Sequence, residues 1–132
     1  MNELAHSTPE PSCVSVAAGP LVAPVLRRVV GMIAAHAELP VDRLDEALLL
    51  IDSIAEHAGD LTTDGRVTTT VAGGDRTLTL ELGPLRAGSA TELVQSGALP
   101  GLGNVIERLS DELAIDVTDG GELLRVQLRA RG

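Results

Sequence analysis

The sequence predicts an α+β fold: a two-layer α/β sandwich with helices packed on one face of a mixed, mainly antiparallel sheet. Two early segments carry apolar residues at three- and four-residue intervals, whereas five others alternate apolar and polar residues. Four of those five alternating segments are joined in pairs by short polar or glycine-rich turns. Hairpin strands pair antiparallel, and helices with one apolar face must cover such a sheet. The chain of 132 residues suits one domain.

The chain is expected to begin with a tail, a strand and a helix. Residues 1–11 carry two prolines among polar neighbours, so we expect a loose, flexible N-terminal tail ahead of a domain over 12–131. Residues 13–17 alternate and predict a short strand. Helical spacing then runs over 21–38 and should stop before Pro40.

A second helix is predicted over 41–58. Asp42 is a suitable N-cap, because its carboxylate can accept a hydrogen bond from a free N–H of the first turn. Gly59 is a suitable C-terminal stop. Together with the first helix it gives the layer that should cover the sheet.

Two hairpins supply most of the predicted sheet. The first joins strands over 66–72 and 77–82, with its turn at Gly73-Gly74-Asp75. The second joins 113–118 to 123–129 around Asp119-Gly120-Gly121.

The connection over 83–103 is rich in Gly, Pro, Ser and Ala. One helical turn is possible at 91–95, and a helix is predicted over 104–113. A connection of this length inside a compact domain is often a lid or a binding loop.

Composition excludes some classes of partner. The chain has no Phe, Tyr or Trp on which bases could stack, all its basic residues are Arg, and its net charge is −9. We therefore expect no direct nucleic-acid binding. An acidic surface suits a basic protein partner, although acidity commonly serves only solubility. No apolar run is long enough for a membrane span, the first residues carry no positive run, and the single Cys13 fits a reducing compartment. A cytoplasmic protein without membrane contact is expected.

A glycine turn opens the predicted last helix, in the run from Gly101 to Glu112 (GLGNVIERLSDE). Glycines there let backbone N–H groups approach an anion at the positive helix end. Alternatively, Gly101 and Gly103 only cap and orient the helix.

This run, the element order and the Leu49-Leu50-Ile51-Asp52 segment resemble one family over nearly the whole chain, residues 12–130. The chain is similar to the bacterial anti-sigma-factor serine/threonine kinases of the GHKL (Bergerat-fold, histidine kinase-like) ATPase superfamily. The resemblance implies a Bergerat-type sandwich, an ATP pocket with magnesium, frequent homodimers, and transcription regulation by partner switching.

The resemblance also implies a Glu and, four residues later, an Asn on the second helix. The Glu assists proton removal, and the Asn oxygen ligates magnesium. Aligned on Asp52, these positions fall on Ser53 and His57. Serine has no basic group near neutral pH, and imidazole is a poor ligand for a hard cation. We therefore predict vacated positions, with no catalytic residue and no metal site, and expect a partly exposed His57 rather than a ligand.

The adenine motif implied by the resemblance is degraded as well. Aligning on Gly83-Pro84 puts Glu81 where the family has an Asp that accepts from the adenine amino group. Strand alternation instead puts Leu82 there, which leaves no carboxylate. The cofactor-binding candidates are Gly83, Gly101, Gly103 and Asn104. Asn104 can contact phosphate or simply cap the last helix.

Two functions follow from the resemblance. The first is a regulatory domain that binds a sigma factor or a STAS-type antagonist, with weak or lost ATP binding and no cofactor. Its contacts would come from the acidic surface and the helices over 21–38 and 41–58. The alternative is an active ATP-dependent serine/threonine kinase that phosphorylates a STAS-type antagonist. That enzyme would bind ATP and magnesium through Gly101, Gly103 and Asn104.

Overall fold

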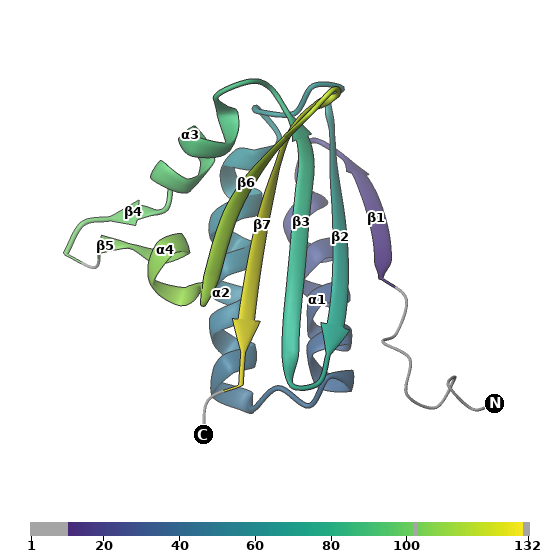
Figure 1. Ribbon diagram of the computed structural model, residues 1–132, viewed down its shortest axis with the longest axis vertical. Coiled ribbons are helices and arrows are strands. Elements are labelled where there is room, and N and C mark those ends of the chain that lie inside the picture. The colour runs from purple at the N-terminus through teal and green to yellow at the C-terminus, as the bar shows by residue number, and fades with distance from the viewer. Residues whose placement is uncertain (1–10, 102, 131–132) are drawn as a thin grey trace.

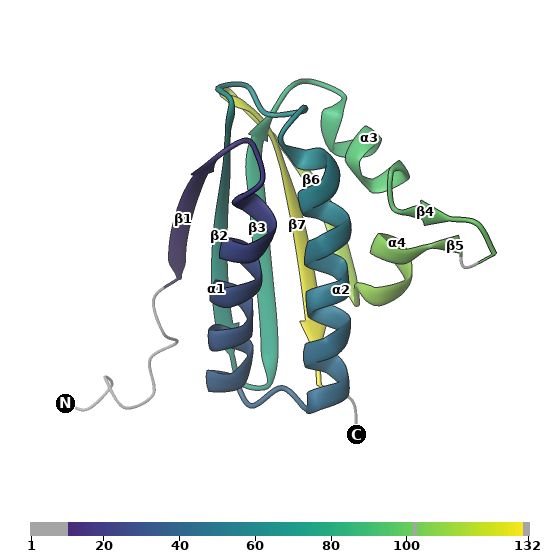
Figure 2. The same cartoon turned by 180° about the vertical axis from the view of Figure 1, so that it is seen from behind.

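A five-stranded sheet with two long helices on one face forms the protein (Figures 1 and 2). The computed structural model describes residues 11–101 and 103–130, apart from the side chain of Leu99, so the predicted tail lies outside the described residues except for Pro11. The strands of the sheet are β1 Ser12–Ala17, β2 Arg66–Gly74, β3 Thr77–Leu85, β6 Glu112–Thr118 and β7 Gly121–Arg129. Their order is β1-β2-β3-β7-β6, and every neighbouring pair is antiparallel. The predicted α+β sandwich is confirmed.

The two helices are α1 Val22–His36 and α2 Val41–Ala58. α1 ends two residues earlier than predicted, because the chain turns there and Glu38 adopts a positive φ of 62°. The N-cap of α2 is Pro40, whose extended backbone precedes the helix. The prediction of an Asp42 cap is therefore wrong, and Asp42 lies in the first turn. The helix residues in the hydrophobic core are Val22, Leu26, Val30, Ala34, Ala47, Leu50, Ile51, Ile54 and Ala58.

The strands contribute one apolar face to the core. Alternation turns every second side chain toward the helices, and those of the three central strands are almost fully buried: Val67, Thr69, Val71, Leu78, Leu80, Leu82, Leu124, Val126 and Leu128. Because the chain has no aromatic residue, the space between the layers is filled with aliphatic side chains. Among the described residues, no helix combines the length and the apolar character needed to cross a membrane.

The first hairpin turns two residues later than predicted. Gly74 pairs with Thr77, so the loop consists of Asp75 and Arg76, and Gly73 belongs to β2. A Cβ atom on Gly73 would lie 3.0 Å from Cγ2 of Ile33 and 3.2 Å from Cβ of Ala37. The glycine is therefore explained by the close approach of α1 and not by the turn.

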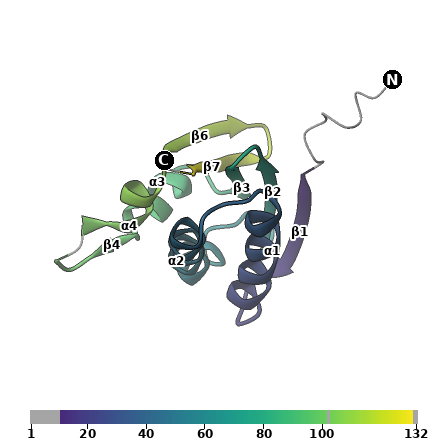
Figure 3. The ribbon, with the colours of Figure 1, turned by 90° about the horizontal axis from the view of Figure 1, so that it is seen from below.

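The long connection is more ordered than predicted. It contains α3 Ser89–Gln95, the two-residue strands β4 Ala98–Leu99 and β5 Gly103–Asn104, and α4 Val105–Leu109. α4 is much shorter than the predicted helix over 104–113, because Ser110 is extended and the chain then enters β6. The β4–β5 hairpin projects away from the sheet and from α2 (Figures 1 and 3).

Two additions of a single methyl group should change stability in opposite directions. Gly73→Ala should lower the free energy of unfolding by about 1–3 kcal/mol, because its Cβ crowds α1. The matched variant Gly31→Ala should raise it by about 0.5–1 kcal/mol, because Gly31 lies within α1 with nothing within 4 Å of an added Cβ. Urea unfolding followed by circular dichroism measures both. Equal effects in the two variants would contradict the packing argument.

Candidate functional site

Ser53 and His57 lie one turn apart on α2, and both are half-buried. Asp52 beside them forms an ion pair with Arg27 of α1, with 2.6 Å between Oδ2 and Nη1. Within residues 11–101 and 103–130, no group of three or more His, Cys, Asp or Glu side chains is arranged to hold a metal ion. The two positions offer a hydroxyl and an imidazole, which differ from the carboxylate and amide that the resemblance implies.

The register of β3 decides which residue faces the helix layer near the adenine motif. Leu82 is 3% exposed and stands opposite Leu124 on the helix side. Glu81 pairs in register with Arg125 on the other face, where its Oε2 lies 3.9 Å from Nη1 of that residue. Leu82 therefore shares the helix-side face with Leu78 and Leu80, as strand alternation predicts. The carboxylate of Glu81 points away from the helices.

Gly83 has a structural explanation. It is buried where the register between β3 and β7 shifts, and a Cβ there would lie 2.6 Å from the carbonyl oxygen of Glu122 and 2.6 Å from Cδ2 of Leu123. A side chain at this position would push the two strands apart. The close approach of β7 accounts for this glycine without any ligand.

Asn104 is the N-cap of α4. Its Oδ1 accepts a hydrogen bond from the backbone N–H of Glu107 at 3.0 Å, and its Nδ2 donates one to the carbonyl oxygen of Val94 at 2.8 Å. Both ends of the amide are thus used inside the protein, joining α4 to α3. The capping alternative raised by the sequence agrees with this geometry.

Gly101 and Gly103 lie at the turn of the β4–β5 hairpin. Both are exposed and have positive φ angles of 79° and 78°, which glycine adopts without strain. The hairpin extends away from α2 (Figure 3). The structure therefore does not bring the glycine turn beside the α2 positions Ser53 and His57.

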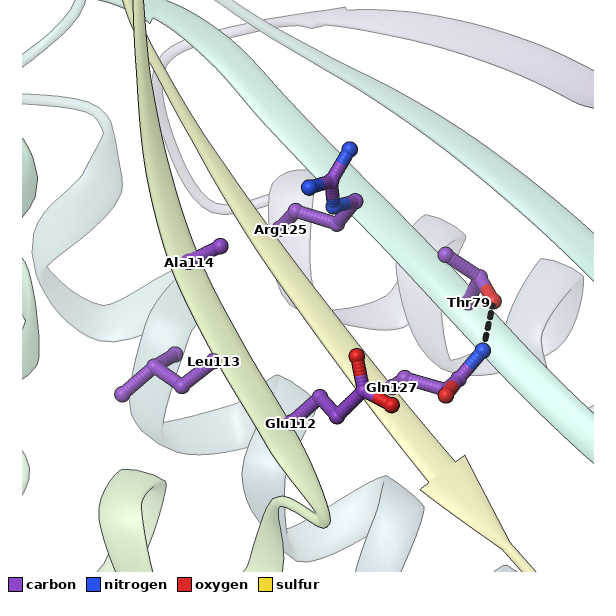
Figure 4. A pocket seen from close by; sticks show the side chains of 6 residues that line it. All are labelled: Thr79, Glu112, Leu113, Ala114, Arg125 and Gln127. Carbon is purple, nitrogen blue, oxygen red and sulfur yellow. Dashed lines mark hydrogen bonds between the residues drawn. The ribbon is translucent and has the colours of Figure 1, made fainter.

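A shallow hollow of about 290 Å³ lies on the open face of the sheet (Figure 4). Its polar groups already have partners: Nε2 of Gln127 donates to Oγ1 of Thr79 at 3.3 Å within the hollow, and Nη1 of Arg125 lies 3.4 Å from Oδ2 of Asp116, which is outside the lining. Glu112, also at the hollow, forms an ion pair with Arg129. These groups stabilise the strands, and their mutual pairing does not resemble an activated nucleophile with its base.

Among the residues that the structure describes, the most deeply buried charge is Arg43 of α2, which sequence reasoning missed. Its side chain is 1% exposed, its Nη2 lies 2.5 Å from Oδ2 of Asp111, and its Nη1 lies 2.7 Å from Oε1 of Glu46. Its Nε donates to the carbonyl oxygen of Arg129 at 3.0 Å. A signal did exist, because Arg43 stands four residues before the buried Ala47, on the stripe of α2 that should be apolar.

Comparison with known proteins adds no family to this picture. No protein-family model matches the chain, and no curated protein gives a significant match. The likeness to anti-sigma-factor kinases therefore remains a prediction from the sequence motifs.

The buried and the exposed arginine should differ sharply in their contribution to stability. Arg43→Ala should lower the free energy of unfolding by about 3 kcal/mol, because two carboxylates and a carbonyl oxygen lose a buried partner. The matched variant Arg27→Ala breaks an ion pair of similar length whose two side chains are 43% and 46% exposed, and should cost less than about 1 kcal/mol. Chemical denaturation of both variants checks this. A similar loss from both would show that Arg43 does not hold the fold together.

Proposed function

We propose that this protein is a regulatory binding domain, similar to the anti-sigma-factor kinases, that holds a protein partner by contact and transfers no phosphate. One observation carries the proposal: the parts of the expected nucleotide site lie apart. The hairpin with Gly101 and Gly103 projects away from α2, and Glu81 lies on the far face of the sheet. Both the oxygen and the nitrogen of the Asn104 side-chain amide form hydrogen bonds inside the protein.

The architecture supports a likeness to the anti-sigma-factor kinases, whereas the residues at the expected catalytic positions do not support phosphotransfer. The order of the elements and the cover of two helices on one sheet face agree with what the resemblance implies. The resemblance, aligned on Asp52, puts Ser53 and His57 where phosphotransfer would need a general base and a ligand for magnesium. Because phosphoryl transfer depends on positioning and on metal charge, the loss of both groups should abolish it.

The solvent side of α2 is the face best suited to a partner. Five carboxylates along the helix and just after it are exposed: Asp42, Asp45, Asp52, Glu56 and Asp60. Leu49 lies among them and is 49% exposed, and Val41 at the start of the helix is 74% exposed. An acidic face with apolar side chains in it is complementary to a basic amphipathic helix. We name a sigma factor or a STAS-type antagonist as the partner.

Mg·ATP should leave the melting temperature unchanged. A working site at a ligand concentration one hundred times its Kd would add about 2.7 kcal/mol, which raises the melting temperature of a domain of this size by roughly 10 °C. The measurement is a thermal melt followed by circular dichroism, with and without millimolar Mg·ATP. A rise of several degrees, followed by transfer of labelled phosphate to a STAS-domain protein, would establish the kinase alternative instead.

Reversing one charge on the acidic face should weaken the partner complex. We expect Asp45→Arg to reduce affinity for a purified sigma factor or STAS-domain protein of the same organism by about fivefold or more at low salt. Asp119→Arg makes the same charge change at the exposed turn between β6 and β7 and should have little effect. Isothermal titration at two salt concentrations gives both values. Equal losses would show that only net charge matters and that α2 is not the contact face.

A further inference from the structure

β6 is the outer strand of the sheet on one side, beyond β7 (Figure 1). Its other side has no partner strand among the described residues. In an antiparallel strand paired on one side only, alternate residues direct their N–H and C=O groups outward. These groups can be satisfied in a regular way only by a further extended strand.

The side chains of β6 on the helix side are apolar and become more exposed along the strand. Leu113, Ile115 and Val117 stand opposite Val126, Leu124 and Glu122, which places all three on the helix side of the sheet. Leu113 packs against the core, Ile115 is 40% exposed, and Val117 is 80% exposed. Edge strands are usually protected by charged residues or proline on such a face. β6 presents bare aliphatic side chains instead.

A hollow adjoins this edge. It has a volume of about 310 Å³ and lies between α3, the start of α4 and β6, with Val94, Leu113 and Ile115 in its walls. Glu107 of α4 also lines it. The hollow therefore continues the apolar strip of β6 toward α3 and adds negative charge beside it.

The other face of β6 carries two carboxylates. Glu112 and Asp116 alternate with the apolar residues and lie on the open side of the sheet. Each is paired with an arginine of β7, Arg129 or Arg125, which lies on the inner side of β6 and not at its free edge. A strand added outside β6 would meet carboxylates on both of its faces.

We propose that the free edge of β6 is a docking site for an extended segment of another protein, with alternating apolar and basic side chains, that adds to the sheet as a sixth strand. Its apolar side chains would cover Ile115 and Val117, and its basic side chains would face Glu112 and Asp116. A second copy of this chain fits less well, because it would bring the same carboxylates to the contact. This site is separate from the acidic face of α2 and does not depend on the function proposed above.

The test uses a fluorescently labelled peptide of alternating lysine and valine, seven residues long, and measures its binding to the full chain by anisotropy. The unmodified protein should bind this peptide, and Val117→Arg should weaken binding by about tenfold or more. Met32→Arg makes the same charge change at an exposed apolar residue of α1, 65% exposed, and should leave the affinity unchanged. Both residues are largely exposed, so neither variant should lose its fold, which circular dichroism checks.

Further measurements separate strand addition from other outcomes. A peptide of the same composition with lysines and valines in separate blocks should bind at least about tenfold more weakly, and amide exchange should slow at Leu113, Ile115 and Val117 when the alternating peptide binds. Equal affinity for the two peptides would show that binding depends on peptide charge alone and not on alternation, which would overturn the proposal. So would sedimentation showing a dimer that Val117→Arg dissociates, combined with no peptide binding, because the occupant would then be a second copy.

Discussion

The guanidinium of Arg43 joins three parts of the chain that are far apart in sequence. It is anchored in α2 and contacts the carboxylate of Asp111, just before β6, and the backbone of Arg129 at the end of β7. Oδ2 of Asp111 also accepts from the N–H of Arg129 at 2.7 Å, so the cluster closes on itself. Since a buried cation is costly unless every donor is used, this network fixes where the helix layer sits on the sheet. The same network contacts the segment between the end of α4 and the start of β6, through Leu109 and Asp111.

The lack of aromatic residues imposes a second constraint, which acts on the distance between the layers. Aliphatic side chains are short, so helices and strands must approach closely to fill the core to normal density. Gly73 marks such a place between β2 and α1, and other glycines lie at close contacts elsewhere in the fold. A Cβ on Gly59 would lie 3.0 Å from Cβ of Ala18, and one on Gly97 would lie 2.9 Å from Cγ1 of Ile106. Glycines that look like turn or loop residues in the sequence therefore serve packing, as Gly73 and Gly83 also do.

Periodicity in the sequence was enough for the two long helices, both hairpins and the fold class, because these depend on local spacing. It failed where a distant residue decides the local structure. The predicted helix over 104–113 stops at Leu109, and Asp111 beyond it is bound by Arg43, which lies 68 residues before it. The sequence offered both roles for Asn104, and the hydrogen bond from the N–H of Glu107 to its Oδ1 shows the capping role. The expected nucleotide site likewise depended on how a connection of some twenty residues folds back, which no local pattern determines.

The two proposed contact surfaces are linked through α3. Val117, at the free edge, stands opposite Glu122 in register, and Oε1 of Glu122 accepts a hydrogen bond from the N–H of Ala90 at 2.9 Å. That bond holds the first turn of α3, which packs in turn against α2 and β7. A strand docked beside Val117 would lie beyond β6, so that β6 stands between it and the carboxylate that positions α3. The contacts between the free edge and α2 therefore run through β7, Glu122 and α3, which are packed against one another.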